Sequence, residues 1–155
     1  MPTFLHKAPV IRPARAEERH ELIELQRRAS LMHEAYREAL TAHPEAVDLP
    51  AAQIDDGSVL VAELGARLAG FIVMLPNGAE VEVDGLFVEP GFWRRGIGRV
   101  LMAAGEAEAR PLGVARLSVI AAPEAEAFYA ACGFVTTGPE STPFGPAIRM
   151  RKTLL

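Results

Sequence analysis

The stretch from Val81 to Arg110 constrains the fold more than any other part of the chain. It reads V-E-V-D-G-L-F-V-E-P-G-F-W-R-R-G-I-G-R-V-L-M-A-A-G-E-A-E-A-R, which predicts an alternating strand, a short basic turn and a helix. Gly85 within the strand is typical of a bulge or a close backbone approach. The alternation places Val81, Val83 and Phe87 on one face of the strand, and Glu82, Asp84 and Leu86 on the other.

The turn has the composition of an anion-binding site. The first N–H groups of a helix have no partner inside the helix, and the helix dipole makes that end positive. Gly96 and Gly98 would let a ligand approach the backbone, and Arg94, Arg95 and Arg99 add positive charge. The turn therefore favours a pyrophosphate site. An ordinary strand-to-helix turn with solvated arginines stays open as the alternative, because short glycine patterns are weak signals.

Length and composition indicate one domain over residues 1–155, large enough for a real core. The net charge of −4 argues against a general affinity for nucleic acids or anionic membranes. Cys132 is the only cysteine, so no internal disulfide can form and a reducing compartment is expected. The sequence shows no signal-peptide pattern and no apolar run long enough to span a bilayer. We expect a soluble cytoplasmic protein.

Local patterns along the rest of the chain predict an α/β protein with a mixed sheet. The strands at 80–88 and 116–120 are joined through a helix, so they should be parallel. A loop is expected at 138–146. The other expected elements are strands at 10–12, 58–64, 68–75, 134–136 and 147–151, and helices at 16–30, 32–42, 99–110 and 124–131.

Two motifs lie on either side of a predicted helix and strand. The first is Leu86-Phe87-Val88-x-Pro90 followed by Arg95-Gly96-Ile97-Gly98, and the second is Ala125-x-x-Phe128-Tyr129-x-x-x-Gly133-Phe134. Together they are much more specific than either alone. Through them the chain resembles the GNAT superfamily of acyl-CoA-dependent N-acyltransferases over nearly its whole length. It departs from the family pattern at Trp93, where Gln or Arg is usual, and at Ala122, where Asn is frequent.

The resemblance implies a GNAT-like fold and acetyl-CoA as the cosubstrate, with no metal. The fold would be a mostly antiparallel sheet of about six to seven strands flanked by helices, with a splayed parallel pair in its middle. Backbone groups of Phe87 and Val88 would pair with the pantetheine arm, and N–H groups of residues 94–99 would hold the pyrophosphate. The expected cofactor-binding residues are Leu86, Phe87, Val88, Arg94, Arg95, Gly96, Ile97, Gly98, Arg99, Phe128 and Tyr129.

The resemblance also implies catalytic roles. Tyr129 would be the general acid near the thioester sulfur, with simple aromatic packing as the alternative. Glu82 would be the base, directly or through water, and Asp84 is its rival, because two nearby carboxylates can raise a pKa. A strand N–H, that of Phe87, would meet the oxyanion.

The acceptor site is expected between the 31–42 helix, the loop after it and the 138–146 loop. His33 and Tyr36 are polar enough to line it, and His33 or His43 is an alternative base. Cys132 is expected to be a small buried residue and not a nucleophile. The sequence contains no cluster of His, Cys, Asp and Glu with the spacing of metal ligands.

We therefore expect an acetyl-CoA-dependent N-acetyltransferase that acts on a primary amine of a small molecule, a peptide or a protein. A catalytically silent acyl-CoA-binding or sensing domain is the alternative, and an interaction module that uses only its sheet is a third. The expected partners are acetyl-CoA and an amine, without nucleic acid or membrane. An exposed edge strand at 147–151 would also suit a homodimer.

Overall fold

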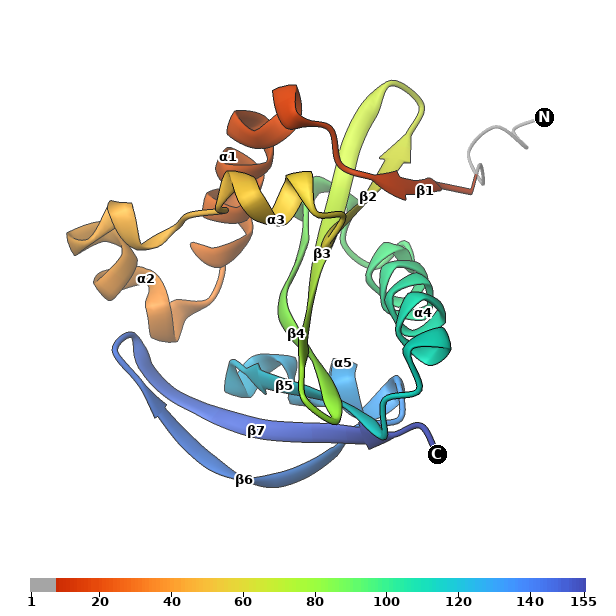
Figure 1. Ribbon diagram of the computed structural model, residues 1–155. Helices are drawn as coiled ribbons and strands as arrows, with labels where there is room; N and C mark the ends of the chain where they lie inside the picture. The colour runs from red at the N-terminus through yellow and green to blue at the C-terminus, as the bar shows by residue number, and fades with distance from the viewer. Residues whose placement is uncertain (1–7) are drawn as a thin grey trace.

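The computed structural model of the chain describes residues 8–155, which build one mixed sheet of seven strands (Figure 1). The strand order is β1-β2-β3-β4-β5-β7-β6, and every neighbouring pair is antiparallel except β4 and β5. The predicted fold class is confirmed. The strands are β1 (Val10–Pro13), β2 (Val59–Leu64), β3 (Arg67–Asn77), β4 (Glu80–Val88), β5 (Arg116–Ala121), β6 (Val135–Thr142) and β7 (Gly145–Thr153).

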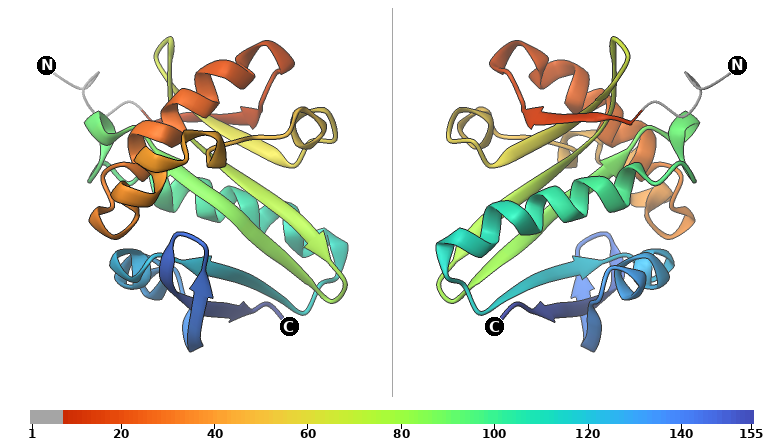
Figure 2. Two further views of the ribbon diagram at one scale, coloured as in Figure 1. Left: turned by 90° about the vertical axis from the view of Figure 1, so that its left-hand side faces the viewer. Right: turned by 90° about the vertical axis from the view of Figure 1, so that its right-hand side faces the viewer.

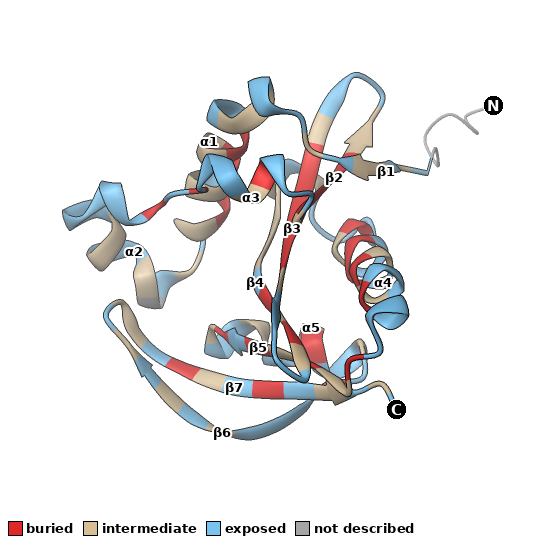
Figure 3. Ribbon diagram, in the orientation of Figure 1, coloured by how far each residue is buried: buried red, intermediate tan, exposed pale blue. Residues whose placement is uncertain are grey.

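Helices cover both faces of the sheet (Figure 2). Leu101 and Met102 of α4 pack on one face, whereas Leu22 and Leu25 of α1 pack on the other, and all four are buried (Figure 3). None of the helices within residues 8–155 is long and apolar enough to cross a membrane. The helices are α1 (Arg19–Ser30), α2 (Glu34–Ala42), α3 (Ala51–Asp55), α4 (Ile97–Ala109) and α5 (Glu126–Ala131).

The parallel pair in the middle of the sheet separates part-way along its length, as predicted. β4 and β5 are paired only from Glu80 opposite Arg116 to Val83 opposite Val119. Beyond Val83 the strands diverge, and the remainder of β4 has a neighbour only in β3. This separation opens a gap between β4 and β5 beside the second half of β4 (Figure 1).

A bulge in β4 changes the faces that the sequence predicted. Val73 lies opposite Gly85 and Met74 lies opposite Val83, so Asp84 is the extra residue. After the bulge, Leu86 packs with Val83 against the α4 side of the sheet. Phe87 packs on the α1 side, where its ring centroid lies 5.3 Å from that of Phe71. The predicted placement of Phe87 with Val83, and of Leu86 opposite them, is therefore wrong.

The C-terminal hairpin corrects two further expectations. Residues 138–146 were expected to form a loop, but most of them belong to β6 and β7, with Glu140 paired to Ala147. Pro139 is accommodated because β6 is an edge strand, where a missing N–H donor costs no ladder bond. β7 lies between β5 and β6, so the strand at 147–151 is interior, and the edges of the sheet are β1 and β6.

Candidate active site

A cavity of about 550 Å³ occupies the gap between β4 and β5, and we call it the gap cavity. Its walls are mainly apolar and come from both faces of the sheet, with Ala29 of α1 on one side and Tyr129 of α5 on the other. Ten of the eleven predicted cofactor-binding residues line it. They are Leu86, Phe87, Val88, Arg94, Gly96, Ile97, Gly98, Arg99, Phe128 and Tyr129.

The backbone of β4 presents alternate residues to this cavity. Glu89 N–H donates to Ala69 O over 2.8 Å, and the antiparallel register then directs the polar groups of Phe87 towards β3 as well. The backbone groups of Leu86 and Val88 therefore face the gap. The oxyanion role that was predicted for the Phe87 N–H is wrong for this reason, and the Leu86 N–H is the strand donor in position. Among the predicted pantetheine partners, Val88 is available and Phe87 is not.

The Trp93 side chain is hydrogen-bonded to one of these backbone groups. Its indole Nε1–H donates to Val88 O over 2.7 Å, and its ring centroid lies 6.4 Å from that of His33. Trp93 is 39% exposed and forms part of the wall of the gap cavity. A ligand that donates a hydrogen bond to Val88 O therefore competes with the indole for this carbonyl group.

The turn between β4 and α4 has the geometry of an anion cradle. Arg94 has φ +68° and Gly96 has φ +79°, so two residues in three adopt the left-handed conformation. Gly96 is the N-cap of the 13-residue helix α4, whose first residues line the gap cavity. The Arg94 and Arg99 side chains line it too. The guanidinium of Arg95 instead lies 5.3 Å from the centre of the Phe92 ring, and Arg95 does not line the cavity.

The two sequence motifs touch at Gly98. A Cβ atom on Gly98 would lie 3.0 Å and 3.2 Å from two carbon atoms of the Phe128 ring. The absence of a side chain therefore lets the start of α4 pack against α5. This contact joins the basic turn to the aromatic residues of the second motif in one wall of the cavity.

Tyr129 is buried at the inner end of this wall. Its ring packs edge-to-face on Phe128 and Phe134, at centroid distances of 5.1 Å and 5.4 Å. Burial, with a smaller contribution from Cys132, raises the pKa of Tyr129 well above its ordinary value. No residue from 8 to 155 forms a hydrogen bond with its hydroxyl. The phenol therefore stays protonated at neutral pH and has a proton to donate.

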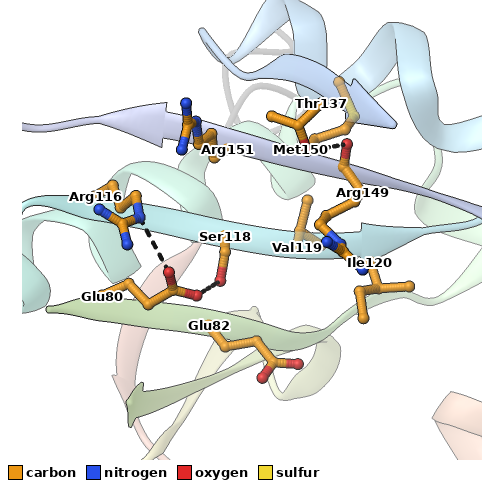
Figure 4. A pocket seen from close by; sticks show the side chains of 10 residues that line it. All are labelled: Glu80, Glu82, Arg116, Ser118, Val119, Ile120, Thr137, Arg149, Met150 and Arg151. Atoms are coloured by element: carbon orange, nitrogen blue, oxygen red, sulfur yellow. Dashed lines mark hydrogen bonds and ion pairs between the residues drawn. The ribbon is translucent and has the colours of Figure 1, made fainter. Parts of the chain in front are cut away.

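Glu82 lies in a second cavity, of about 530 Å³, on the sheet face that α4 does not cover (Figure 4). We call it the face cavity. Burial is the main reason why the pKa of Glu82 is raised, and the nearby charges of Asp84 and Glu80 add to the shift. Asp84 is exposed and lines neither cavity, although desolvation raises its pKa. The side chains that line the face cavity are Glu80, Glu82, Arg116, Ser118, Val119, Ile120, Thr137, Arg149, Met150 and Arg151.

The family model for the GNAT acetyltransferase domain matches residues 28–154. The chain belongs to the GNAT acetyltransferase family. The match covers both cavities and every predicted site residue. A comparison with curated proteins gave no sequence match.

Solved GNAT structures share the whole fold. A GCN5-related N-acetyltransferase from Rhodopseudomonas palustris is 24% identical, with 96% of this chain and 97% of that chain covered and a TM-score of 0.77. PaiA N-acetyltransferase from Thermoplasma acidophilum, solved in complex with coenzyme A, is 20% identical over 96% and 100% of the chains, with a TM-score of 0.76. Ribosomal-protein-alanine N-acetyltransferase from Brucella melitensis is 23% identical over 94% and 99%, with a TM-score of 0.72. At these identities the likeness shows the fold.

The residues expected to meet the acceptor are divided by the structure. His33 precedes α2 and lines the gap cavity. Tyr36 lines neither cavity, and its hydroxyl donates to Pro146 O over 3.4 Å, which connects α2 with β7. His43 is exposed, and its Nδ1 atom lies 3.3 Å from Glu45 Oε1. Cys132 is half-buried, and burial raises the pKa of its thiol, which does not favour a nucleophilic thiolate.

Sequence reasoning missed four residues of the gap cavity: Ala29, Phe92, Glu124 and Ala125. Phe92 lies between the two parts of the first motif, Ala125 begins the second motif, and Glu124 directly precedes it, so the motifs themselves mark these three positions. Ala29 is brought to the cavity only by the packing of α1, and no local signal marks it. Within residues 8–155, no three His, Cys, Asp or Glu side chains are grouped as metal ligands would be.

Proposed function

We propose that the chain is an N-acetyltransferase that moves the acetyl group of acetyl-CoA to a primary amine of a small molecule, a peptide or a protein. One observation carries the proposal: the strand end, the basic turn and the buried Tyr129 all open into the same cavity. The GNAT family match supports the same reaction class.

The cosubstrate would lie along the gap cavity. The free N–H groups at the start of α4, with Arg94 and Arg99, suit the pyrophosphate, because a helix N-terminus favours negative charge. The pantetheine amides would pair with the backbone groups of Leu86 and Val88 that face the gap, as a neighbouring strand would, and at Val88 O they would replace the Trp93 indole. The acetyl thioester would then lie beside Leu86 and close to Tyr129.

The reaction would be a direct attack on the thioester. The neutral amine nitrogen forms the new C–N bond, and the thioester oxygen takes the negative charge, which the Leu86 N–H stabilises. The C–S bond then breaks, and Tyr129 donates its proton to the leaving thiolate. The nitrogen becomes positively charged when it attacks, and it loses this extra proton to solvent to give the neutral amide. The Tyr129 phenolate takes up one proton from solvent, which restores the phenol.

Glu82 would remove a proton from the ammonium group of the acceptor, which converts it to the neutral amine before the attack. Its raised pKa brings it closer to neutral pH, which favours exchange of a proton with an amine. Because Glu82 lines the face cavity and Leu86 lines the gap cavity, a water molecule between them would complete the transfer. Asp84 remains the rival, and its exposed position makes it the weaker candidate.

A free-thiol assay with acetyl-CoA and a panel of amines tests the proposal. We expect CoA release that depends on one class of amine and saturates with both substrates. CoA release at the same rate with and without every amine would contradict it. Binding of acetyl-CoA, followed by the rise in melting temperature that mass action predicts, provides the parallel control.

A silent acyl-CoA sensor is the second candidate. The observation that favours it is that Glu82 does not line the cavity in which the thioester would lie. This candidate predicts the same shift in melting temperature with acetyl-CoA but no amine-dependent CoA release. The two measurements together therefore separate an enzyme from a sensor.

A further inference from the structure

The face cavity contains a row of three side chains that crosses three strands. Glu82 of β4 is paired with Ser118 of β5, and Ser118 is paired with Arg151 of β7. Because neighbouring strands lie about 4.8 Å apart, the Cα atoms of Glu82 and Arg151 are about 10 Å apart. Ser118 lies between them, and all three side chains line the same cavity (Figure 4).

Most of the charges around this row already have partners. Glu80 accepts hydrogen bonds from Arg116 Nε over 3.0 Å and from Ser118 Oγ over 2.6 Å, and Arg149 forms an ion pair with Glu140. Glu82 and Arg151 are different. Neither forms an ion pair or a side-chain hydrogen bond with any residue of the range 8–155. The hydrogen bond from Ser118 is the main reason why the pKa of Glu80 is lowered, and the Arg151 charge makes a smaller contribution, so Arg151 acts on Glu80 only at longer range. One carboxylate and one guanidinium without ion-pair partners thus lie at opposite ends of a single row.

This arrangement is complementary to a molecule that carries both charges. An ammonium group is attracted to a carboxylate, and the planar guanidinium of arginine binds a carboxylate with two parallel hydrogen bonds. Ser118 is small and its hydroxyl is turned to Glu80, so it leaves the space between the two charges open. Ile120, 47% exposed in the same cavity, offers apolar surface to a short aliphatic chain.

We propose that the face cavity binds the acceptor as an amino carboxylate, with its amine at Glu82 and its carboxylate at Arg151. The inference rests on the proposed function, because it names the substrate class of that same reaction. It also gives Glu82 two roles, since the group that attracts the ammonium is the group that accepts its proton. Arg151 has no part in the chemistry and acts as a specificity-determining residue.

Matched pairs of acceptors test this directly. Each pair consists of an ω-amino acid, with two to six carbon atoms between its charged groups, and its methyl amide, which keeps the amine but lacks the carboxylate. At saturating acetyl-CoA we expect kcat/KM to favour at least one acid over its amide by about 10-fold to 100-fold, as a charge-assisted hydrogen-bond pair would give.

The variants make the test specific to Arg151. Arg151→Gln should abolish the preference by raising KM for the acid, while kcat/KM for the amide stays within about two-fold, because a charge-assisted pair adds only acid-specific binding. Arg151→Lys should retain part of the preference for the acid. Arg15→Gln, an exposed arginine near the opposite edge of the sheet, should leave both acceptors unaffected. Equal use of acid and amide in every pair, or an equal loss for both with Arg151→Gln, would overturn the inference.

Calorimetric binding of the same pairs to the CoA-bound protein separates this inference from the proposed function. If no amine is acetylated but an acid binds in an Arg151-dependent way, the proposed function fails and the amino carboxylate site stands. If amines are acetylated and neither binding nor turnover distinguishes an acid from its amide, the acceptor class is wrong and the proposed function stands.

Discussion

The two cavities beside β4 are built in opposite ways. The gap cavity is largely apolar and aromatic, and most of its lining residues come from two segments, 86–99 and 124–129. The face cavity is lined largely by charged and polar residues, and each of four strands contributes between one and four of its lining residues. A site of the first kind suits a ligand that binds like an added strand, whereas the second depends on a few individual charges. The first can therefore be recognised from a motif, and the second cannot.

The largest expected effect is that of Tyr129→Phe in the gap cavity. Removal of the hydroxyl takes away the proton for the leaving thiolate, so kcat should fall by about 100-fold or more. The acetyl-CoA dissociation constant should stay within about two-fold, because the ring still packs on Phe128 and Phe134. Steady-state kinetics and calorimetry measure the two values. An unchanged kcat would remove Tyr129 from the mechanism.

Glu82→Gln tests the base from the other cavity. We expect kcat/KM to fall by about 100-fold at neutral pH, since general base catalysis typically contributes that much. In the wild-type protein the rate should rise with pH as the Glu82 carboxyl loses its proton, and burial places this rise above the ordinary glutamate range. The rise should be absent in the variant. A rise that survives unchanged in Glu82→Gln would assign it to another group.

Asp84→Asn tests whether Glu82 or Asp84 is the base. The negative charge of Asp84 helps to raise the pKa of Glu82, so its removal should lower that pKa. The ascending limb of the pH profile should then move to lower pH, while the maximal rate changes little. A loss of maximal rate as large as that of Glu82→Gln would instead identify Asp84 as the base.

Gly98→Ala should disturb only the gap cavity. The new methyl group would lie 3.0 Å from the Phe128 ring, so the ring must shift by a few tenths of an ångström in the wall of the cavity. We expect acetyl-CoA to bind about 10-fold more weakly, because such overpacking typically costs 1–3 kcal/mol. Gly91→Ala is the matched control, since nothing lies within 4 Å of a Cβ atom there. Equal affinities in the two variants would disconnect the Gly98–Phe128 contact from cosubstrate binding.

The smallest effect is expected at Trp93, the only tryptophan in the chain. We expect a pantetheine amide to replace the indole as the hydrogen-bond donor to Val88 O. Acetyl-CoA should therefore change the tryptophan fluorescence. Trp93→Phe removes this competition, and calorimetry should show binding up to about five-fold tighter, as the loss of one competing hydrogen bond predicts. Weaker binding in this variant would show that the indole contributes to the bound state.

Much of the fold and of the gap cavity could be predicted from the sequence, because the relevant signals are local. The basic turn, Gly98 and Phe128-Tyr129 lie in continuous motifs, and the parallel pair follows from the helical connection between β4 and β5. Glu82 was selected through the resemblance to the GNAT superfamily, from its offset to the turn along one strand, and its role as the base stays a prediction.

The remainder depends on strand pairing, which no local pattern encodes. The bulge at Asp84 reversed the faces of Leu86 and Phe87, and the antiparallel register with β3 turned the Phe87 N–H away from the gap. Arg151 gained its position opposite Glu82 only through the pairing of β5 with β7. The paired residues of these strands are far apart in the sequence, from 27 positions for Ala121 and Ile148 to 37 for Arg116 and Thr153. A polar edge strand at 135–142 also resembles a loop in sequence.

A crystal structure of the protein with acetyl-CoA is the most direct test of the central claim that the gap cavity binds the cosubstrate. We predict that the pyrophosphate lies at the start of α4, that the pantetheine arm lies along Leu86 and Val88, and that the Trp93 indole is released from Val88 O. Acetyl-CoA bound outside this cavity, or bound with the indole still on Val88 O, would contradict it.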